Sequence, residues 1–183
     1  QPDVVVELGV TSGLLELAVQ SFPELDVIGL DRDQGALDVA AGRFLREAGR
    51  DGTWLKADIF TPEAWLQPDL GGRKGLIFSV HFHEFIARGL EHTQNWLREM
   101  RQRLPGWCVV AIEQPRLRPS ERSEVSDAQW LYNHSNVLIH HLIGNGRILS
   151  DPDWRKLFTE AGCELEEIHP IEFLGYNAYI FRF

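Results

Sequence analysis

Residues 4–18 read VVVELGVTSGLLELA, an apolar β-branched run followed by a glycine-bounded turn and a segment with helical spacing. A short apolar run that ends at glycine predicts a buried strand. Gly9 and Gly13 favour a tight strand-to-helix turn, because glycine adopts backbone conformations and allows close approaches that other residues forbid. This stretch therefore predicts the first strand–turn–helix unit of an α/β protein.

The alternation of strand and helix continues along the chain. We expect strands at 3–9, 26–31, 53–60, 75–82, 107–113, 163–171 and 176–183, and helices at 13–20, 34–49, 92–104, 127–143 and 151–162. Strands that alternate with helices predict a doubly wound, mostly parallel, Rossmann-like sheet of seven strands. The short turn between the last two strands predicts an antiparallel strand at one edge. Such a sheet binds ligands at the carboxyl ends of its strands.

The length and composition restrict the class of protein. A chain of 183 residues with 44% hydrophobic and 25% charged residues fits one globular domain, residues 1–183. The net charge of −9, with no long basic run, argues against nucleic-acid and membrane partners and favours a small molecule. Cys108 and Cys163 stand in apolar stretches and predict buried thiols in a reducing, cytoplasmic compartment. Because the chain begins directly on a strand, we expect it to be part of a longer protein.

Three acidic residues mark the expected ligand end of the sheet. Asp31 ends the second strand, roughly 20 residues past the glycines, where a carboxylate can accept hydrogen bonds from both ribose hydroxyls. Asp58 ends the third expected strand beside apolar Ile59, where it can accept from an adenine amino group. Glu7 lies inside the first strand, where it suits a cationic amino group. Together they predict a nucleoside pocket.

A dinucleotide is the first alternative for this pocket. The G-x-G-x-x-G pattern is absent, and the chain is short for a dehydrogenase with a substrate domain. A carboxylate at position 7 is also a poor neighbour for a pyrophosphate. A cofactor that combines ribose, adenine and an amino acid without phosphate is S-adenosylmethionine, and we predict this cofactor.

The sequence resembles the catalytic domain of small-molecule O-methyltransferases of the caffeate and hydroxyindole type, within the seven-stranded methyltransferase superfamily. The resemblance spans nearly the whole chain but only the C-terminal domain of that family. It is carried by VELGVTSG (6–13), LDRD (30–33), KADIF (56–60), FHEF (82–85), CVVAIEQP (108–115) and SDPDWRKLFTEAGC (150–163). These match the family's glycine turn, ribose acid, adenine segment, L-H-D-W, fifth strand ending in Glu, and T-x-x-E-W-x-x-L-x-x-A-G-F.

The resemblance implies a set of cofactor contacts and three departures from the family pattern. The cofactor-binding residues that we predict are Glu7, Gly9, Thr11, Gly13, Asp31, Arg32, Asp58, Ile59 and Ser79. Thr11 replaces a glycine in the tightest part of the turn, and Ser79 stands where many members have lysine. Ile148 stands where the family often has a second glutamate. The resemblance also implies that a helical N-terminal domain, which usually dimerises and closes the acceptor pocket, lies outside this chain.

The segment FSVHFHEF (78–85) carries the predicted chemistry. Transfer of a methyl group from a sulfonium requires in-line positioning and removal of the acceptor's proton. Histidine suits the proton transfer because its ordinary pKa lies near neutrality. The resemblance makes His83, at the end of the fourth expected strand, the general base, and it makes Glu113 the acidic partner that orients the ring.

Two alternatives remain open at this point. His81 and His83 share one face if the strand continues through them, as metal ligands would require, so a metal-assisted or C-directed transfer is one alternative. His134, His140 and His141 could add ligands, although only one of the last two can face the site. A non-catalytic methyltransferase-like binding module is the other alternative. The residues that we expect to line the acceptor pocket are Trp130, His134 and His141.

Overall fold

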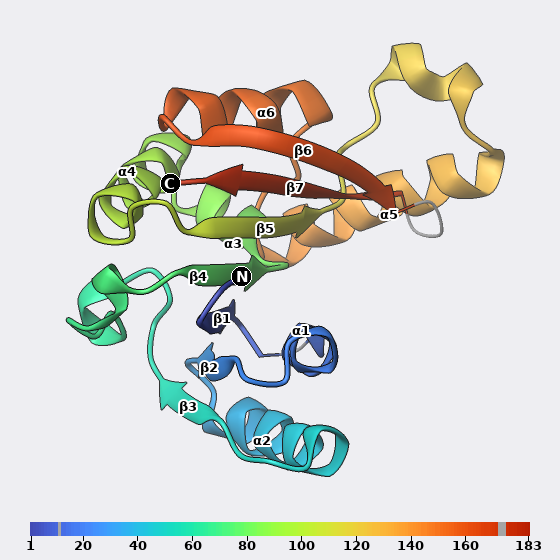
Figure 1. Ribbon diagram of the computed structural model, residues 1–183. Coiled ribbons are helices and arrows are strands. Elements are labelled where there is room, and N and C mark those ends of the chain that lie inside the picture. The colour runs from blue at the N-terminus through green and yellow to red at the C-terminus, as the bar shows by residue number, and fades with distance from the viewer. Residues whose placement is uncertain (11, 172–174) are drawn as a thin grey trace.

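The computed structural model describes residues 1–10, 12–171 and 175–183. Its strands are β1 (Val4–Leu8), β2 (Asp26–Asp31), β3 (Thr53–Lys56), β4 (Gly75–Ser79), β5 (Cys108–Glu113), β6 (Glu164–Ile171) and β7 (Tyr176–Arg182). They form a seven-stranded sheet in the order β3-β2-β1-β4-β5-β7-β6 (Figure 1). Strands β1 to β5 pair in parallel, whereas β7 is antiparallel to both β5 and β6. The predicted seven-stranded, doubly wound sheet with an antiparallel hairpin at one edge is confirmed.

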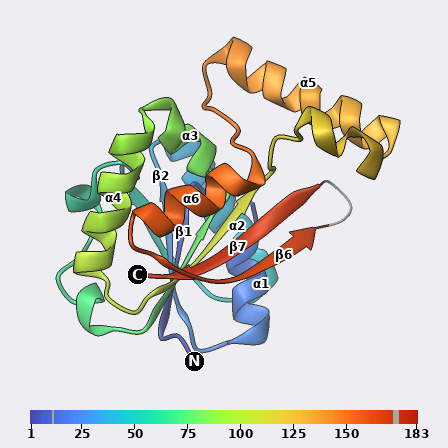
Figure 2. The same ribbon diagram turned by 90° about the horizontal axis from the view of Figure 1, so that it is seen from above.

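Helices cover both faces of this sheet. Their bounds are α1 (Leu14–Ser21), α2 (Gln34–Ala48), α3 (Phe82–Ala87), α4 (Leu90–Arg103), α5 (Asp127–Ile143) and α6 (Asp151–Glu160), with short 3-10 turns η1 (Pro62–Ala64), η2 (Leu70–Gly72) and η3 (Pro119–Glu124). Helices α1 and α2 lie on one face, and α3, α4 and α6 lie on the other (Figure 2). The order of strands reverses between β1 and β4, so the carboxyl ends of these two strands form the topological switch point.

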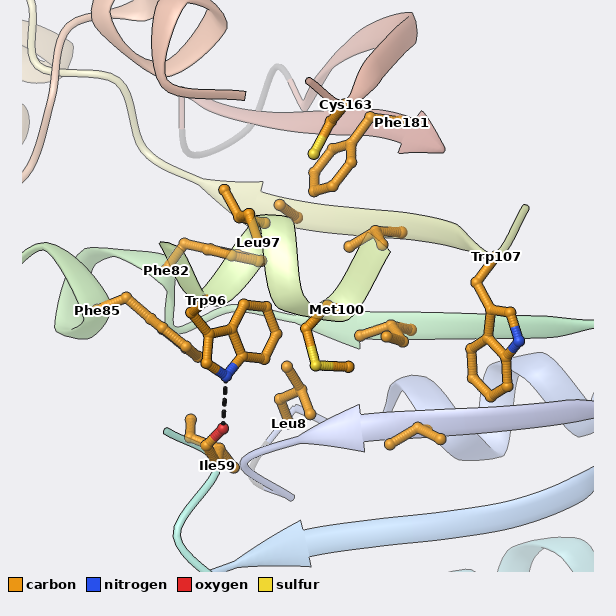
Figure 3. Packing of buried hydrophobic residues seen from close by; sticks show 14 of the residues in the cluster. Leu8, Ile59, Phe82, Phe85, Trp96, Leu97, Met100, Trp107, Cys163 and Phe181 are labelled. Atoms are coloured by element: carbon orange, nitrogen blue, oxygen red, sulfur yellow. Dashed lines mark hydrogen bonds between the residues drawn. The ribbon is translucent and has the colours of Figure 1, made fainter. Parts of the chain in front are cut away.

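The first strand shows how the sequence pattern builds both layers. Val4, Val6 and Leu8 pack into the large core under α3, α4 and α6, whereas Val5 packs into the smaller core under α1 and α2. Successive strand side chains point to opposite faces, so a strand covered on both sides is apolar at most positions, with Glu7 as the exception in β1. In the large core the Trp96 indole donates a hydrogen bond of 3.1 Å to the carbonyl of Ile59, which ties α4 to the segment after β3 (Figure 3).

The expected fourth strand is wrong beyond Ser79. Strand β4 ends there, and α3 begins at Phe82, with His81 as its N-cap. Phe82, Phe85 and Ile86 are buried at the spacing of one helical face, which is the signal that the sequence reading missed. The expected third strand is also too long, because β3 ends at Lys56 and the backbone then turns through Asp58.

Helix α5 lies outside both helical layers, beyond the carboxyl end of β5 (Figure 2). Large apolar side chains on it are exposed: Leu131, Tyr132, Leu138, Ile139, Leu142 and Ile143. Between Asp127 and Gly144 the helix carries no Asp, Glu, Lys or Arg. Exposed apolar surface of this extent is typical of an interaction face. Among the described residues no helix is both long enough and apolar enough to span a membrane.

Candidate active site

The glycine turn after β1 has the backbone conformation that its sequence predicts. Gly9 has a φ of 82° and Gly13, the N-cap of α1, a φ of 79°, both in the left-handed region that favours glycine. Glu7 is buried, and one of its carboxylate oxygens accepts a hydrogen bond from the Ser12 hydroxyl. Its Oε2 has no partner among the described residues, and burial raises the pKa of Glu7. Thr11 lies outside the described residues.

A pocket of about 300 Å³ opens at the carboxyl ends of β1 and β2. Its lining is Gly9, Asp31, Arg32, Asp33, Ala36, Ala57, Asp58, Ile59, Phe60, His81 and Glu84. Asp31 Oδ1 accepts a hydrogen bond of 2.9 Å from the backbone N–H of Asp33, which holds the carboxylate at the end of β2. The pocket thus contains five predicted cofactor residues, whereas Glu7 and Gly13 lie outside its lining.

The far end of the pocket is formed by the segment after β3. Asp58 Oδ1 accepts from the backbone N–H of Phe60 at 3.0 Å, and Oδ2 lies 3.4 Å from the Arg88 guanidinium. The same guanidinium lies over the Phe60 ring, 3.7 Å from its centroid. Ile59 is buried beneath this segment. The result is a polar rim above an apolar floor, which suits a planar heteroaromatic ring.

His81 forms the wall of the pocket nearest the glycine turn. A Cβ added to Gly9 would lie 2.4 Å from Cδ2 of the His81 ring, so this contact requires glycine. The backbone N–H of His81 donates to Ser79 Oγ at 3.2 Å, and its Nδ1 lies 3.5 Å from Glu84 Oε1. The hydrogen bond with His81 lowers the pKa of Glu84. Ser79 is fully buried and positions His81 instead of lining the pocket.

His83 lies in the first turn of α3 and meets Glu113 at the end of β5. Its ring Nδ1 lies 2.9 Å from Glu113 Oε2, and its backbone N–H donates to Oε1 at 3.2 Å. The side chains are 13% and 3% exposed, so water screens this pair weakly. Burial alone lowers the pKa of His83, but the charge and hydrogen bond of Glu113, with a smaller contribution from Glu84, raise it overall. A carboxylate on Nδ1 leaves Nε2 as the proton acceptor.

Comparison with solved structures relates this site to known proteins. The chain matches the methyltransferase CalO6 with a TM-score of 0.72 and 21% identity, over 97% of this chain and 56% of that one. It matches the mitomycin 7-O-methyltransferase MmcR with a TM-score of 0.73 and 17% identity, over 99% and 49%. A third match is NcsB1, an O-methyltransferase from neocarzinostatin biosynthesis in complex with S-adenosylmethionine and 2-hydroxy-5-methyl naphthoic acid. Its TM-score is 0.66 at 19% identity, over 98% and 48%.

The chain has the fold of these methyltransferases. It spans about half the length of the solved chains that it matches. No family model matches the sequence, and no curated protein matches it. At these identities the likeness establishes the methyltransferase fold, and the chemistry is inferred from the site itself.

The residues predicted to line the acceptor pocket, Trp130, His134 and His141, lie on α5. Trp130 stacks on His134, with ring centroids 4.0 Å apart, and His134 and His141 are both exposed. It is His140, between them and half-buried, that reaches the site: its ring centroid lies 4.6 Å from that of His83. His140 was not among the residues predicted for the acceptor side. Successive helix positions differ by roughly 100°, so only one of His140 and His141 could face inward.

A second cavity adjoins this helix. It has a volume of about 290 Å³ and is lined by Gln114, Leu117, Val125, Ala128, Gln129, Tyr132, Asn133 and Gly175. Gln114 directly follows Glu113, and Asn133 ties the helix to the β5 loop by donating to the Pro115 carbonyl at 2.8 Å. Tyr132, on the same helix as Trp130 and His134, lines this cavity.

The proposed pairing of His81 and His83 on one strand face is wrong, because the helix begins between them. Their ring centroids are nevertheless 6.1 Å apart. His81, His83 and Glu84 each offer a donor atom, and these atoms lie within 4.8 Å of one another, which makes this group the candidate for a metal ion among the described residues. Ile148, where the family often has glutamate, is buried and apolar.

Proposed function

We propose that this chain is an S-adenosylmethionine-dependent methyltransferase domain that transfers a methyl group to a hydroxyl of a small molecule. The observation that carries the proposal is the His83–Glu113 pair, held at the switch point beside a pocket that contains Asp31 and Asp58. This reaction requires a base whose ring is held in one orientation, next to a pocket whose lining suits a nucleoside.

The residues of the pocket fit the cofactor. Asp31 suits the ribose hydroxyls, and Asp58 with buried Ile59 suits adenine. The unpartnered Oε2 of Glu7, on the strand that leads into the glycine turn, suits a cationic amino group. The acidic lining favours a cation over a pyrophosphate, which supports S-adenosylmethionine over a dinucleotide.

The cofactor and the residues of the chain supply different parts of the proposed reaction. When bound, S-adenosylmethionine would be held by Asp31 and Asp58 and would supply an activated methyl group whose leaving group is a neutral thioether. His83 Nε2 takes the proton of the acceptor hydroxyl, so that the oxygen lone pair forms the new O–C bond. Glu113 stabilises the positive charge that His83 then carries. His81 lines the pocket beside Gly9.

We also propose that the acceptor side is completed by polypeptide outside these 183 residues. Two observations support this. The matched solved chains are about twice as long as this one. The exposed apolar face of α5 lies next to the cavity that Tyr132 lines, so a segment that covers the face also covers the cavity.

Calorimetric titration tests the cofactor assignment. We expect saturable binding of S-adenosylmethionine and of its demethylated product, and no heat with NADH. Asp31→Ala should weaken binding by about tenfold or more, because hydrogen bonds to a charged acceptor disappear. The matched control is Asp38→Ala, an exposed acid on α2 outside the pocket, which should bind like the wild type. Binding of NADH without binding of S-adenosylmethionine would refute the proposal.

A further inference from the structure

His140 is the side chain of α5 that contacts the ring of His83. The two ring centroids lie 4.6 Å apart with an interplanar angle of 74°, an edge-to-face contact. His140 is half-buried, in contrast to His141, which is exposed. Edge-to-face contacts between planar rings are directional, so they restrict the orientation of both rings. The contact therefore limits rotation of the His83 imidazole on the side that Glu113 does not cover.

The ring of His140 is itself held in place. Its Nδ1 lies 3.1 Å from the carbonyl oxygen of Asn145, which can only accept, so Nδ1 carries the hydrogen in this bond. The backbone N–H of Asn145 donates back to the carbonyl of His140 at 3.1 Å. The reciprocal bonds join the end of α5 to the loop that follows it, and they leave the ring with one orientation.

The loop 144–147, which follows α5, also contacts the backbone of His83. The N–H of Arg147 donates to the His83 carbonyl at 3.1 Å. Gly146, with a φ of 106°, packs so closely that an added Cβ would lie 2.2 Å from that carbonyl oxygen. His83 is thus held by Glu113 at its N–H and Nδ1, by the loop 144–147 at its carbonyl, and by His140 at its ring.

We propose that His140 is a positioning residue that fixes the plane of the His83 imidazole, so that Nδ1 stays on Glu113 and Nε2 stays available as the proton acceptor. This inference rests on the proposed function for its catalytic consequence, but the orientation of the ring can be measured without turnover. It assigns to α5 a role in holding the base, in addition to bordering the acceptor. The contact requires the planar edge of a ring at position 140, and it does not require that His140 carry a proton.

The experiment compares His140→Ala, His140→Phe and the control His92→Ala, an exposed histidine on α4. We expect His140→Ala to lower kcat about tenfold, because a base that leaves its productive orientation transfers the proton less often. The acceptor KM and the Kd for S-adenosylmethionine should stay within about twofold. His140→Phe should recover most of kcat because phenylalanine keeps the planar edge, and His92→Ala should behave as wild type.

A spectroscopic readout separates positioning from general stability. Nitrogen-15 NMR of the histidine side chains should show His83 with its hydrogen on Nδ1 in the wild type and in His140→Phe, and a mixture of tautomers in His140→Ala. If no acceptor is methylated, the proposed function fails while the NMR comparison still decides the role of His140.

Two results would overturn the inference: an unchanged kcat and unchanged His83 signals in His140→Ala, or a loss in His140→Phe equal to that in His140→Ala. Should His140→Ala fail to fold by circular dichroism, His140→Leu is measured in its place, since leucine fills the space without a planar edge. Wild-type signals in His140→Leu would then contradict the inference in the same way.

Discussion

Replacing Glu113 with glutamine tests the link between the carboxylate and the base most directly. Glu113 accepts from both the ring and the backbone N–H of His83, one with each oxygen. Glutamine has one acceptor oxygen and no charge, so at most one of these bonds survives. A hydrogen bond to a charged group contributes about 1.5–3 kcal/mol, and much of this stabilisation of the protonated ring is lost with the charge. We therefore expect the pKa of His83 to fall.

The direction of the effect on rate follows from the sign of that shift. In the wild type, Glu113 raises the pKa of His83, so the imidazole becomes neutral and able to act at a higher pH than it would without the carboxylate. The rate should fall as pH falls through this raised pKa. In Glu113→Gln the acid limb should move to lower pH, and the plateau should drop on the order of tenfold because the ring loses its orientation.

The assay is the pH profile of kcat/KM, measured by release of the demethylated cofactor, with NMR titration of His83 alongside. Glu91→Gln, an exposed substitution on α4, is the matched control for removal of one negative charge. An acid limb at the same pH in Glu113→Gln and in Glu91→Gln would refute the reasoning. It would mean that another group limits the rate on the acid side.

Four further predictions concern the base, the pocket, the core and the missing acceptor side. His83→Ala should lower kcat by about 10²–10⁴-fold at saturating cofactor, and His81→Ala should lower it less. Equal losses in the two variants would indicate a metal site if wild-type activity is also lost on chelation and returns with added metal. Gly9→Ala should weaken cofactor binding at least tenfold by calorimetry, because the new Cβ meets the His81 ring. Phe158→Ala, fully buried, should lower the free energy of unfolding by about 3–5 kcal/mol in urea, against about 0.5 or less for exposed Val39→Ala. The 183-residue chain should bind the cofactor but methylate slowly, and full turnover by the monomer would contradict an acceptor side completed from outside.

Much of the fold follows from the sequence because its central strands β1 and β2 are largely apolar and buried. Asp3 and Gly9 flank residues 4–8, and the type of both strands was predictable, with bounds correct to within one residue. The structure of the segment 78–85 was not predictable, because the apolar residues of FSVHFHEF fit a strand as well as a short helix. Only the burial of Phe82, Phe85 and Ile86 together decides for the helix.

The site was predictable to a similar degree. Asp31 and Asp58 could be placed from their positions after strands, and the structure brings both to one pocket. The partnership of His83 with Glu113 came from the resemblance, and it depends on the neighbouring strands β4 and β5 ending at the same edge. His140 could not be placed in this way, because the direction of α5 relative to the sheet is set by tertiary contacts such as Asn133 with the β5 loop.

The two histidine–carboxylate pairs differ in a way that assigns their roles. His81 and Glu84 are 20% and 24% exposed, their atoms lie 3.5 Å apart, and His81 rests on the glycine turn inside the cofactor pocket. His83 and Glu113 are more buried and closer, at 2.9 Å. Because charge interactions strengthen as water is excluded, the buried Glu113 acts strongly on His83 and raises its pKa. The less buried pair therefore suits the binding of a cofactor that must enter and leave, and the more buried pair suits the transfer of a proton.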